Sequence, residues 1–293
     1  MTILKALILP NYGKELTQDC TQAVCGILEQ VGCRVVMQPL CWDCVNADPA
    51  SDKLTAEKLS EGCDVLVAIG GDGTMMHAAK FAAEAGKPIL GVNTGRLGFM
   101  AGLESTEPEL ISRLVSGEYT TEQRMLLDVE VIRGGKTYRI DHAINDAVVS
   151  RGALSKIITI KVHHNGRQAM ELRADGLIVS TPTGSTAYAL SAGGPVIDPS
   201  LKCIEVTPVC PHSLMDRAII FDSDSELLIE ADRRREDYLT LPDDHINLAV
   251  DGERTCELNA GDTIRIRRSE LCAEFIIIKK QSFANLLMQK FIN

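Results

Sequence analysis

Residues 65–74 read VLVAIGGDGT, an apolar run that continues directly into a glycine-rich loop. The apolar part, residues 65–69, carries no polar side chain, which is typical of a strand buried on both faces of a parallel sheet. An Ala-rich stretch at 74–85 follows at once and ends at Gly86, so we expect it to be a helix. A strand, a glycine loop and a helix in this order indicate a layered α/β domain.

Strand and helix patterns alternate on both sides of this stretch, from the N-terminus to about residue 120. The expected elements are strands over 3–9, 33–37 and 88–92 and helices over 16–31 and 108–115. Such alternation predicts a parallel sheet with right-handed crossovers. We therefore expect residues 1–120 to form a Rossmann-like parallel α/β domain that carries the glycine loop.

After residue 120 the pattern changes to short strands joined by turn residues. The expected strands cover 126–132, 137–140, 157–163, 168–172, 226–230, 245–250 and 262–267. Asn165-Gly166 favours a tight hairpin, and two further Gly-containing turns, at 134–135 and 251–252, support the series. We expect residues 121–269 to form an antiparallel β domain, packed as a sandwich or a barrel. The tail, 270–293, contains a short amphipathic segment and could return to the first domain.

Composition and charge restrict the classes of function. The chain has 293 residues, of which 45% are hydrophobic and 24% charged, so disordered and collagen-like proteins are excluded. No apolar run reaches the roughly 18 residues that a membrane span needs, and the N-terminus lacks a signal-peptide pattern. The net charge of −10 argues against non-specific binding of nucleic acid or of an anionic membrane. We expect a cytoplasmic protein.

The chain contains 10 cysteines. Because it is long and shows no export signal, we expect reduced thiols that pack as small apolar side chains. Cys41 and Cys44 have the spacing of a redox motif or of half a zinc site, but no second such pair completes a zinc site. The residues that follow, with Asn46, Asp48 and Pro49, suit a loop better than a helix. Redox or metal use of this pair is the alternative, and no metal ligand is assigned.

The glycine loop lies where open parallel sheets bind ligands, at the carboxyl end of a strand. Glycines leave room for a phosphate, which backbone amides at the start of a helix can bind. Asp72 would repel that phosphate, so it needs a role of its own. It could hold a divalent cation or accept a proton from an attacking hydroxyl. The structural alternative is that Asp72 only caps the helix.

Two further polar segments follow predicted strands or lie beside them. Residues 91–99, GVNTGRLGF, form a loop that could run alongside the first, and Arg96 could reach a phosphate. Residues 175–195, DGLIVSTPTGSTAYALSAGGP, concentrate Ser, Thr and Tyr hydroxyls that could bind the hydroxyls of a sugar. The alternative for this second segment is an ordinary polar loop with Ser/Thr turns.

Together, the three segments resemble the NAD kinase family, which phosphorylates NAD to NADP. The Gly-Gly-Asp-Gly element is shared with diacylglycerol and sphingosine kinases, whereas the stretch TPTGSTAY at 181–188 is much more specific. The resemblance covers most of residues 64–268. It implies transfer of the γ-phosphoryl group of ATP to the 2′-hydroxyl of the adenosine ribose of NAD. It also implies a divalent cation, magnesium, carried with ATP, and a homodimer or homotetramer; polyphosphate could replace ATP.

The resemblance also implies roles for single residues. Asp72 would be the general base, with Gly71 and Gly73 in the phosphate-binding loop. His77, one helical turn on, would lie near NAD, with a plain helix-surface histidine as the alternative. The remaining contacts with NAD are expected from Asn145, Asp146, Lys156, Arg173, Asp175, Thr186, Ala187, Tyr188, Ser191 and Glu253.

Some of these positions carry a finer expectation. Asn145-Asp146 would contact the NAD ribose, with an acid one methylene shorter than the family's usual Glu. Arg173 and Asp175 would line the nicotinamide side, and Tyr188 would lie near the base. Glu253 stands where the family usually has Gln.

Two other functions remain open at this level. A lipid kinase would need an apolar acceptor cleft or a basic, membrane-directed surface, and the acidic balance disfavours it. A catalytically silent dinucleotide sensor is disfavoured by the intact Asp72.

Overall fold

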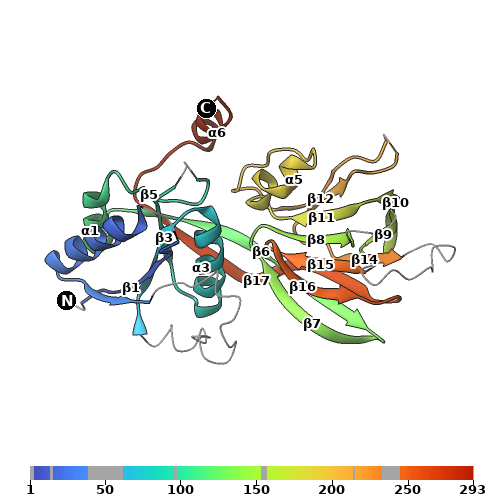
Figure 1. Cartoon of the computed structure of the whole chain (residues 1–293), viewed down its shortest axis with the longest axis horizontal. Helices are drawn as coiled ribbons and strands as arrows, with labels where there is room; N and C mark the ends of the chain where they lie inside the picture. The colour runs from blue at the N-terminus through green and yellow to red at the C-terminus, as the bar shows by residue number, and fades with distance from the viewer. Residues whose placement is uncertain are drawn as a thin grey trace. The chain divides into compact units, whose positions relative to one another are not determined.

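The structure is a computed structural model that describes residues 3–13, 16–38, 62–95, 98–152, 157–213, 215–232 and 245–292 (Figure 1). The chain divides into two compact units. Unit 1 comprises Met1–Gln123 and Leu271–Asn293, and unit 2 comprises Arg124–Glu270. Each unit has a hydrophobic core of its own.

Unit 1 is a parallel sheet packed against helices. Its elements are β1 (Lys5–Pro10), α1 (Thr17–Gln30), β2 (Arg34–Met37), β3 (Val65–Gly70), α3 (Asp72–Ala85), β4 (Ile89–Asn93), β5 (Leu103–Glu104), η1 (Pro108–Ser112), α4 (Arg113–Ser116), the last part of β17 (Thr263–Ile277) and α6 (Phe283–Ile292). The strand order is β17-β4-β3-β1-β2, and β5 pairs with the carboxyl end of β4, at Val92 and Asn93. The sheet therefore places the end of β3, and the loop after it, beside the end of β4.

The central strand β3 is buried along its whole length, as its apolar sequence predicts. Helix α1 buries Cys20, Val24 and Leu28, which recur at helical spacing and pack into the core of the unit. Helix α3 ends at Gly86, which takes the left-handed conformation (φ 60°) that glycine adopts without strain.

Unit 2 consists almost entirely of antiparallel strands. Its elements are the main part of β6 (Thr120–Arg133), β7 (Lys136–Ala143), β8 (Asp146–Arg151), β9 (Ile158–His164), β10 (Arg167–Ala174), β11 (Gly176–Ser180), η2 (Gly184–Thr186), α5 (Tyr188–Ser191), β12 (Cys203–Val209), β13 (Ile219–Asp222), β14 (Leu227–Asp232), β15 (Ile246–Val250), β16 (Glu253–Leu258) and the first part of β17. One sheet has the order β13-β12-β11-β8-β15-β16. The second contains β10-β9-β14-β17 and the hairpin β6-β7, and apolar residues from both sheets form one core.

The predicted fold class, a parallel α/β part with a β-sandwich-like part, is confirmed. The hairpin at Asn165-Gly166 joins β9 to β10, and both residues have positive φ (49° and 77°), as a tight two-residue turn requires. None of the helices in the described part of the chain is long and apolar enough to cross a membrane.

The structure refines some local predictions. The expected helix at 108–115 is present, but it begins as the 3₁₀ helix η1, in which the Ser112 hydroxyl donates to the Glu109 carbonyl at 2.8 Å, and continues as the α-helix α4. Strand β11, at the start of the segment 175–195, was not among the expected strands. Strand β12 was not predicted because polar residues, including Glu205 and Thr207, interrupt its apolar pattern. Cys41, Cys44, Arg96 and Lys156 lie outside the described residues.

Candidate active site

The glycine loop joins β3 to α3 at the carboxyl end of the unit 1 sheet. Gly71 is extended (φ −105°, ψ −175°) and precedes Asp72, which is the first residue of α3. A side chain at position 70 would clash with the Thr74 side chain, so glycine is needed there. Gly73 is exposed, and no atom lies within 4 Å of where its Cβ would be. The first turn of α3 therefore combines a helix N-terminus with room for a phosphate.

The second loop runs beside the first, as its sequence suggested. The Thr94 amide donates to the Gly70 carbonyl at 2.9 Å, and the Phe99 amide donates to Asp72 Oδ2 at 3.2 Å. Gly98 packs so closely on Asp72 Oδ1 that a Cβ at this position would clash with the carboxylate. Residues 98–99 thus fix where the Asp72 side chain points.

Asp72 does not cap the helix, because Gly71 holds the cap position and no side-chain capping bond is present there. Its Oδ2 faces Lys290 Nζ at 3.3 Å as well as the Phe99 amide. Its Oδ1 is buried and has no hydrogen-bond donor among the described residues. The side chain is 36% exposed, so this carboxylate is held in place while part of it stays accessible.

Polar contacts support the loop from the neighbouring strand ends. Asn11, after β1, donates through Nδ2 to Thr74 Oγ1 at 2.9 Å. Asn93, at the end of β4, donates to Glu104 Oε2 at 2.9 Å. Burial, with a smaller contribution from the Asp72 charge, raises the pKa of Glu104 above its ordinary value. Among the described residues, no group of three or more His, Cys, Asp or Glu side chains is arranged to hold a metal ion.

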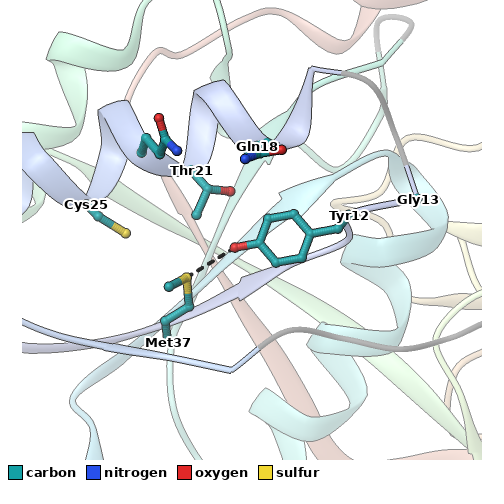
Figure 2. Close-up of a pocket in the computed structure, with 7 residues that line it drawn as sticks. Tyr12, Gly13, Gln18, Thr21, Cys25 and Met37 are labelled. Atoms are coloured by element: carbon teal, nitrogen blue, oxygen red, sulfur yellow. Dashed lines mark hydrogen bonds between the residues drawn. The ribbon is translucent and has the colours of Figure 1, made fainter.

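A pocket of about 720 Å³ opens elsewhere in unit 1, between α1 and the residues after β1 (Figure 2). Figure 2 shows the Tyr12 hydroxyl pointing at the Met37 sulfur, 3.3 Å away, with Thr21 and Cys25 of α1 on the other side. None of the predicted site residues lines it. Asn11 connects this region to the glycine loop, because it also accepts from the Gly13 amide at 3.1 Å.

In unit 2, Asn145 and Asp146 are held by a carboxylate that the sequence analysis did not single out. Asp251 accepts hydrogen bonds from the Ile144, Asn145 and Asp146 amides, at 3.0, 2.7 and 3.2 Å. Asp251 takes positive φ (51°) in the turn after β15, which directs it back to these amides. It therefore fixes the backbone that presents the predicted ribose contacts.

Asp146 is 5% exposed. Burial, followed by repulsion from Asp251, raises the pKa of Asp146 to about 7. At neutral pH its carboxyl group is consequently divided between the protonated and ionised forms. A protonated carboxyl group can donate a hydrogen bond as well as accept one.

The hydroxyls at 180–186 are largely used within the protein. Thr181 donates to the Ile144 carbonyl at 2.6 Å, and Ser185 donates to the Pro182 carbonyl at 2.7 Å. The Thr186 hydroxyl donates to the Thr183 carbonyl at 3.2 Å. Ser180, Thr181 and Ser185 are completely buried. The hydroxyls of Ser180, Thr181, Ser185 and Thr186 therefore hold the segment together, as the alternative of a polar loop with Ser/Thr turns predicts, and sugar binding by the segment stays a prediction.

A second buried carboxyl group, also missed, fixes the end of the segment. Glu205 is completely buried and accepts from the hydroxyls of Ser180 at 3.1 Å and Thr207 at 2.6 Å. Burial raises its pKa above the ordinary value. Gly194 approaches it so closely that any side chain there would clash with Glu205 Oε1.

The other predicted site residues are in varied surroundings. Tyr188 and Ser191 are exposed on α5, Glu253 is exposed at the start of β16, and Thr186 and Ala187 are partly exposed. Asp175 is paired with Arg151, whose Nε lies 2.6 Å from Asp175 Oδ1. Arg173 Nε is buried and has no partner among the described residues. His77 is partly buried on α3.

Comparison with known proteins identifies the family. The model of the ATP-NAD kinase N-terminal domain matches residues 7–119, and that of the C-terminal domain matches residues 144–278. The chain belongs to the NAD kinase family. The NAD kinase of Acetivibrio thermocellus is 34% identical over 292 residues, 98% of this chain and 97% of that protein. The NAD kinase of Geobacter metallireducens is 39% identical over 241 residues, 81% of each chain.

Two solved structures of NAD(H) kinases share the fold. Yeast NADH kinase, complexed with NADH, has a TM-score of 0.80 and 21% identity, over 99% of this chain and 88% of that one. An NAD kinase from Archaeoglobus fulgidus, in complex with ATP, has a TM-score of 0.69 and 23% identity, over 97% of each chain. Neither these structures nor the two relatives favours a lipid kinase or a silent sensor.

Proposed function

We propose that the chain makes NADP by transferring the γ-phosphoryl group of ATP to the 2′-hydroxyl of the adenosine ribose of NAD, with Asp72 as the general base. The observation that carries this proposal is the position of Asp72. Its carboxylate lies in the first turn of α3, among glycines, and is oriented by the Phe99 amide at 3.2 Å. A proton acceptor fixed beside a phosphate-binding helix end is what phosphoryl transfer to a hydroxyl needs.

The reaction forms one P–O bond and breaks another. The 2′-oxygen of NAD attacks the γ-phosphorus, ADP leaves, and the hydroxyl proton passes to Asp72. The amides around Gly71 and Gly73 would bind the phosphates, and their fixed dipoles offset charge that develops on the transferring group. A divalent cation, which we propose to be magnesium, would arrive with ATP as part of the substrate and neutralise further phosphate charge.

Unit 2 would supply the recognition of NAD. Asn145 and Asp146 suit the ribose hydroxyls, because Asp251 holds their backbone in place and Asp146 can donate or accept a hydrogen bond. Support for the two substrates comes from the NADH and ATP present in the solved structures of the same fold. The further contacts that we propose involve His77, Lys156, Arg173, Asp175, Thr186, Ala187, Tyr188, Ser191 and Glu253.

Two finer properties belong to the same proposal. The enzyme would act in the cytoplasm and assemble as a homodimer or homotetramer. Exposed edge strands in unit 2, such as β13 with Ile219 and Ile220, offer surface for assembly. Light scattering on the purified chain would give the oligomeric state directly.

The test is NADP formation from NAD and ATP with magnesium, measured with an NADP-specific dehydrogenase. NADP should appear in proportion to enzyme, while sphingosine and diacylglycerol should not be phosphorylated under the same conditions. Phosphorylation of either lipid without NADP formation would contradict the proposal. Replacing ATP by polyphosphate in the same assay tests whether polyphosphate is also a donor.

A further inference from the structure

Lys290, on the C-terminal helix α6, contacts the glycine loop. Its Nζ lies 3.3 Å from Asp72 Oδ2. The two side chains are 28% and 36% exposed, so the pair is partly shielded from water. The residues lie 218 positions apart in the sequence, and the helix that carries Lys290 has no other predicted role.

Phe99 contacts both partners, Lys290 through its ring and Asp72 through its backbone amide. Lys290 Nζ lies 4.0 Å from the centroid of the Phe99 ring, on its face. The Phe99 amide donates to the same Asp72 oxygen that faces Lys290. Phe283, two helical turns before Lys290 on α6, packs against the Phe99 ring with centroids 6.1 Å apart. The helix is therefore held with its lysine on the loop.

A carboxylate in a phosphate-binding loop creates an electrostatic problem. Asp72 repels the phosphates that the surrounding amides attract, and its charge also disfavours ionisation of the nearby Glu104. A lysine within 4 Å of the carboxylate cancels this repulsion at close range.

We propose that Lys290 is a positioning residue, whose ammonium neutralises Asp72 so that the glycine loop can accept the polyphosphate chain of ATP. The inference rests on the proposed function in taking this loop as the phosphate site. It adds that α6 is part of the donor site.

The test measures binding of inorganic tripolyphosphate to the full chain by calorimetry, without magnesium. Lys290→Met should weaken binding about tenfold, equivalent to about 1.4 kcal/mol. Asp72→Asn should tighten it by a similar factor. The double variant, in which the pair again has no net charge, should bind within about threefold of wild type.

Matched variants distinguish the effect of losing the Lys290 charge from a general effect of substitution on folding. Lys290→Arg should bind within about threefold of wild type, because it keeps the charge and can stack on Phe99. Lys279→Met is the control: it removes a lysine of the same unit that pairs with Glu107 at 2.8 Å, and it should leave binding unchanged. If Lys290→Met does not fold, Lys290→Gln replaces it. The loss should shrink at high salt, because added ions screen the charge.

Two results would overturn the inference. One is a Lys290→Met variant that folds and binds as wild type; the other is a double variant as weak as Lys290→Met alone. In turnover, Lys290→Met should raise the KM for ATP and leave the KM for NAD unchanged. Tripolyphosphate binding can be measured whether or not the chain forms NADP. If the variants bind tripolyphosphate as expected but the wild type forms no NADP, the proposed function is rejected and this inference stands.

Discussion

Two segments of this chain are rich in glycine and small polar residues, but the structure uses them differently. In the loop at 70–74, glycines leave space around one charged side chain, Asp72, which stays partly exposed. In the stretch at 180–186, buried hydroxyls bond to backbone carbonyls and to Glu205. The first arrangement leaves a carboxylate available to a ligand, whereas in the second most hydroxyls are already hydrogen-bonded within the protein. A hydroxyl-rich motif can therefore identify a family while most of its hydroxyls support the backbone.

The sharpest way to disturb the first loop without touching its charge is Gly98→Ala. The new Cβ would clash with Asp72 Oδ1 and displace the carboxylate. We expect kcat to fall about 100-fold, since small displacements of a catalytic group have effects of this size. Gly26→Ala, in α1, is the control, because its Cβ would meet no atom within 4 Å. Equal kcat values for the two variants would show that the position of Asp72 is not critical.

In unit 2, Asp146→Ala should act on NAD alone. We expect the KM for NAD to rise about tenfold or more and the KM for ATP to stay near its wild-type value. Steady-state kinetics with each substrate varied in turn measures both. An equal rise in the two constants would reject the ribose contact.

Ser185→Ala tests the supporting role of the hydroxyl segment. Ser185 accepts from the buried Ile197 amide at 3.0 Å and donates to the Pro182 carbonyl at 2.7 Å. Its loss should lower the free energy of unfolding by about 1–3 kcal/mol and change kcat and the KM for NAD by less than about twofold. Ser112→Ala, at an exposed hydroxyl, is the control for denaturant unfolding. A stable Ser185→Ala variant that loses affinity for NAD would mean that this hydroxyl binds ligand.

The last expected effect concerns the pH dependence of stability and is similar in size. The pKa of Asp146 is about 7 in the folded protein and about 4 in an unfolded chain. Between these values the folded protein keeps a proton that the unfolded chain has lost, so this group lowers stability as pH rises. Asn does not titrate, so Asp146→Asn lacks this loss of stability. The free energy of unfolding of the variant minus that of the wild type should therefore be greater at pH 8 than at pH 5, by about 1–3 kcal/mol. A constant difference across this range would contradict the raised pKa.

Much of the fold was predictable because its signals are local. The apolar run of β3, the helix stop at Gly86 and the Asn165-Gly166 turn each depend on a few adjacent residues. The helix expected at 108–115 is present, but its first part is a 3₁₀ helix, which apolar spacing does not distinguish from an α-helix.

The side chains that hold the site residues in place, Asp251 and Lys290, were not predictable from local sequence signals. Asp251 holds the Asn145 amide across 106 positions, and Lys290 reaches Asp72 across 218. Contacts at such separations arise from tertiary packing, which leaves no periodic trace in the sequence. Asp72 itself was identifiable because its unusual neighbours are adjacent to it.

Asp72, as the group that takes the proton, is the residue on which the proposed reaction depends most. The most direct measurement is NADP formation by Asp72→Asn, with NAD binding determined by calorimetry on the same preparation. The expected result is loss of turnover by about 1000-fold or more, with the Kd for NAD within about tenfold of wild type. Turnover within about tenfold of wild type would contradict the assignment and leave Asp72 as a structural residue of the loop.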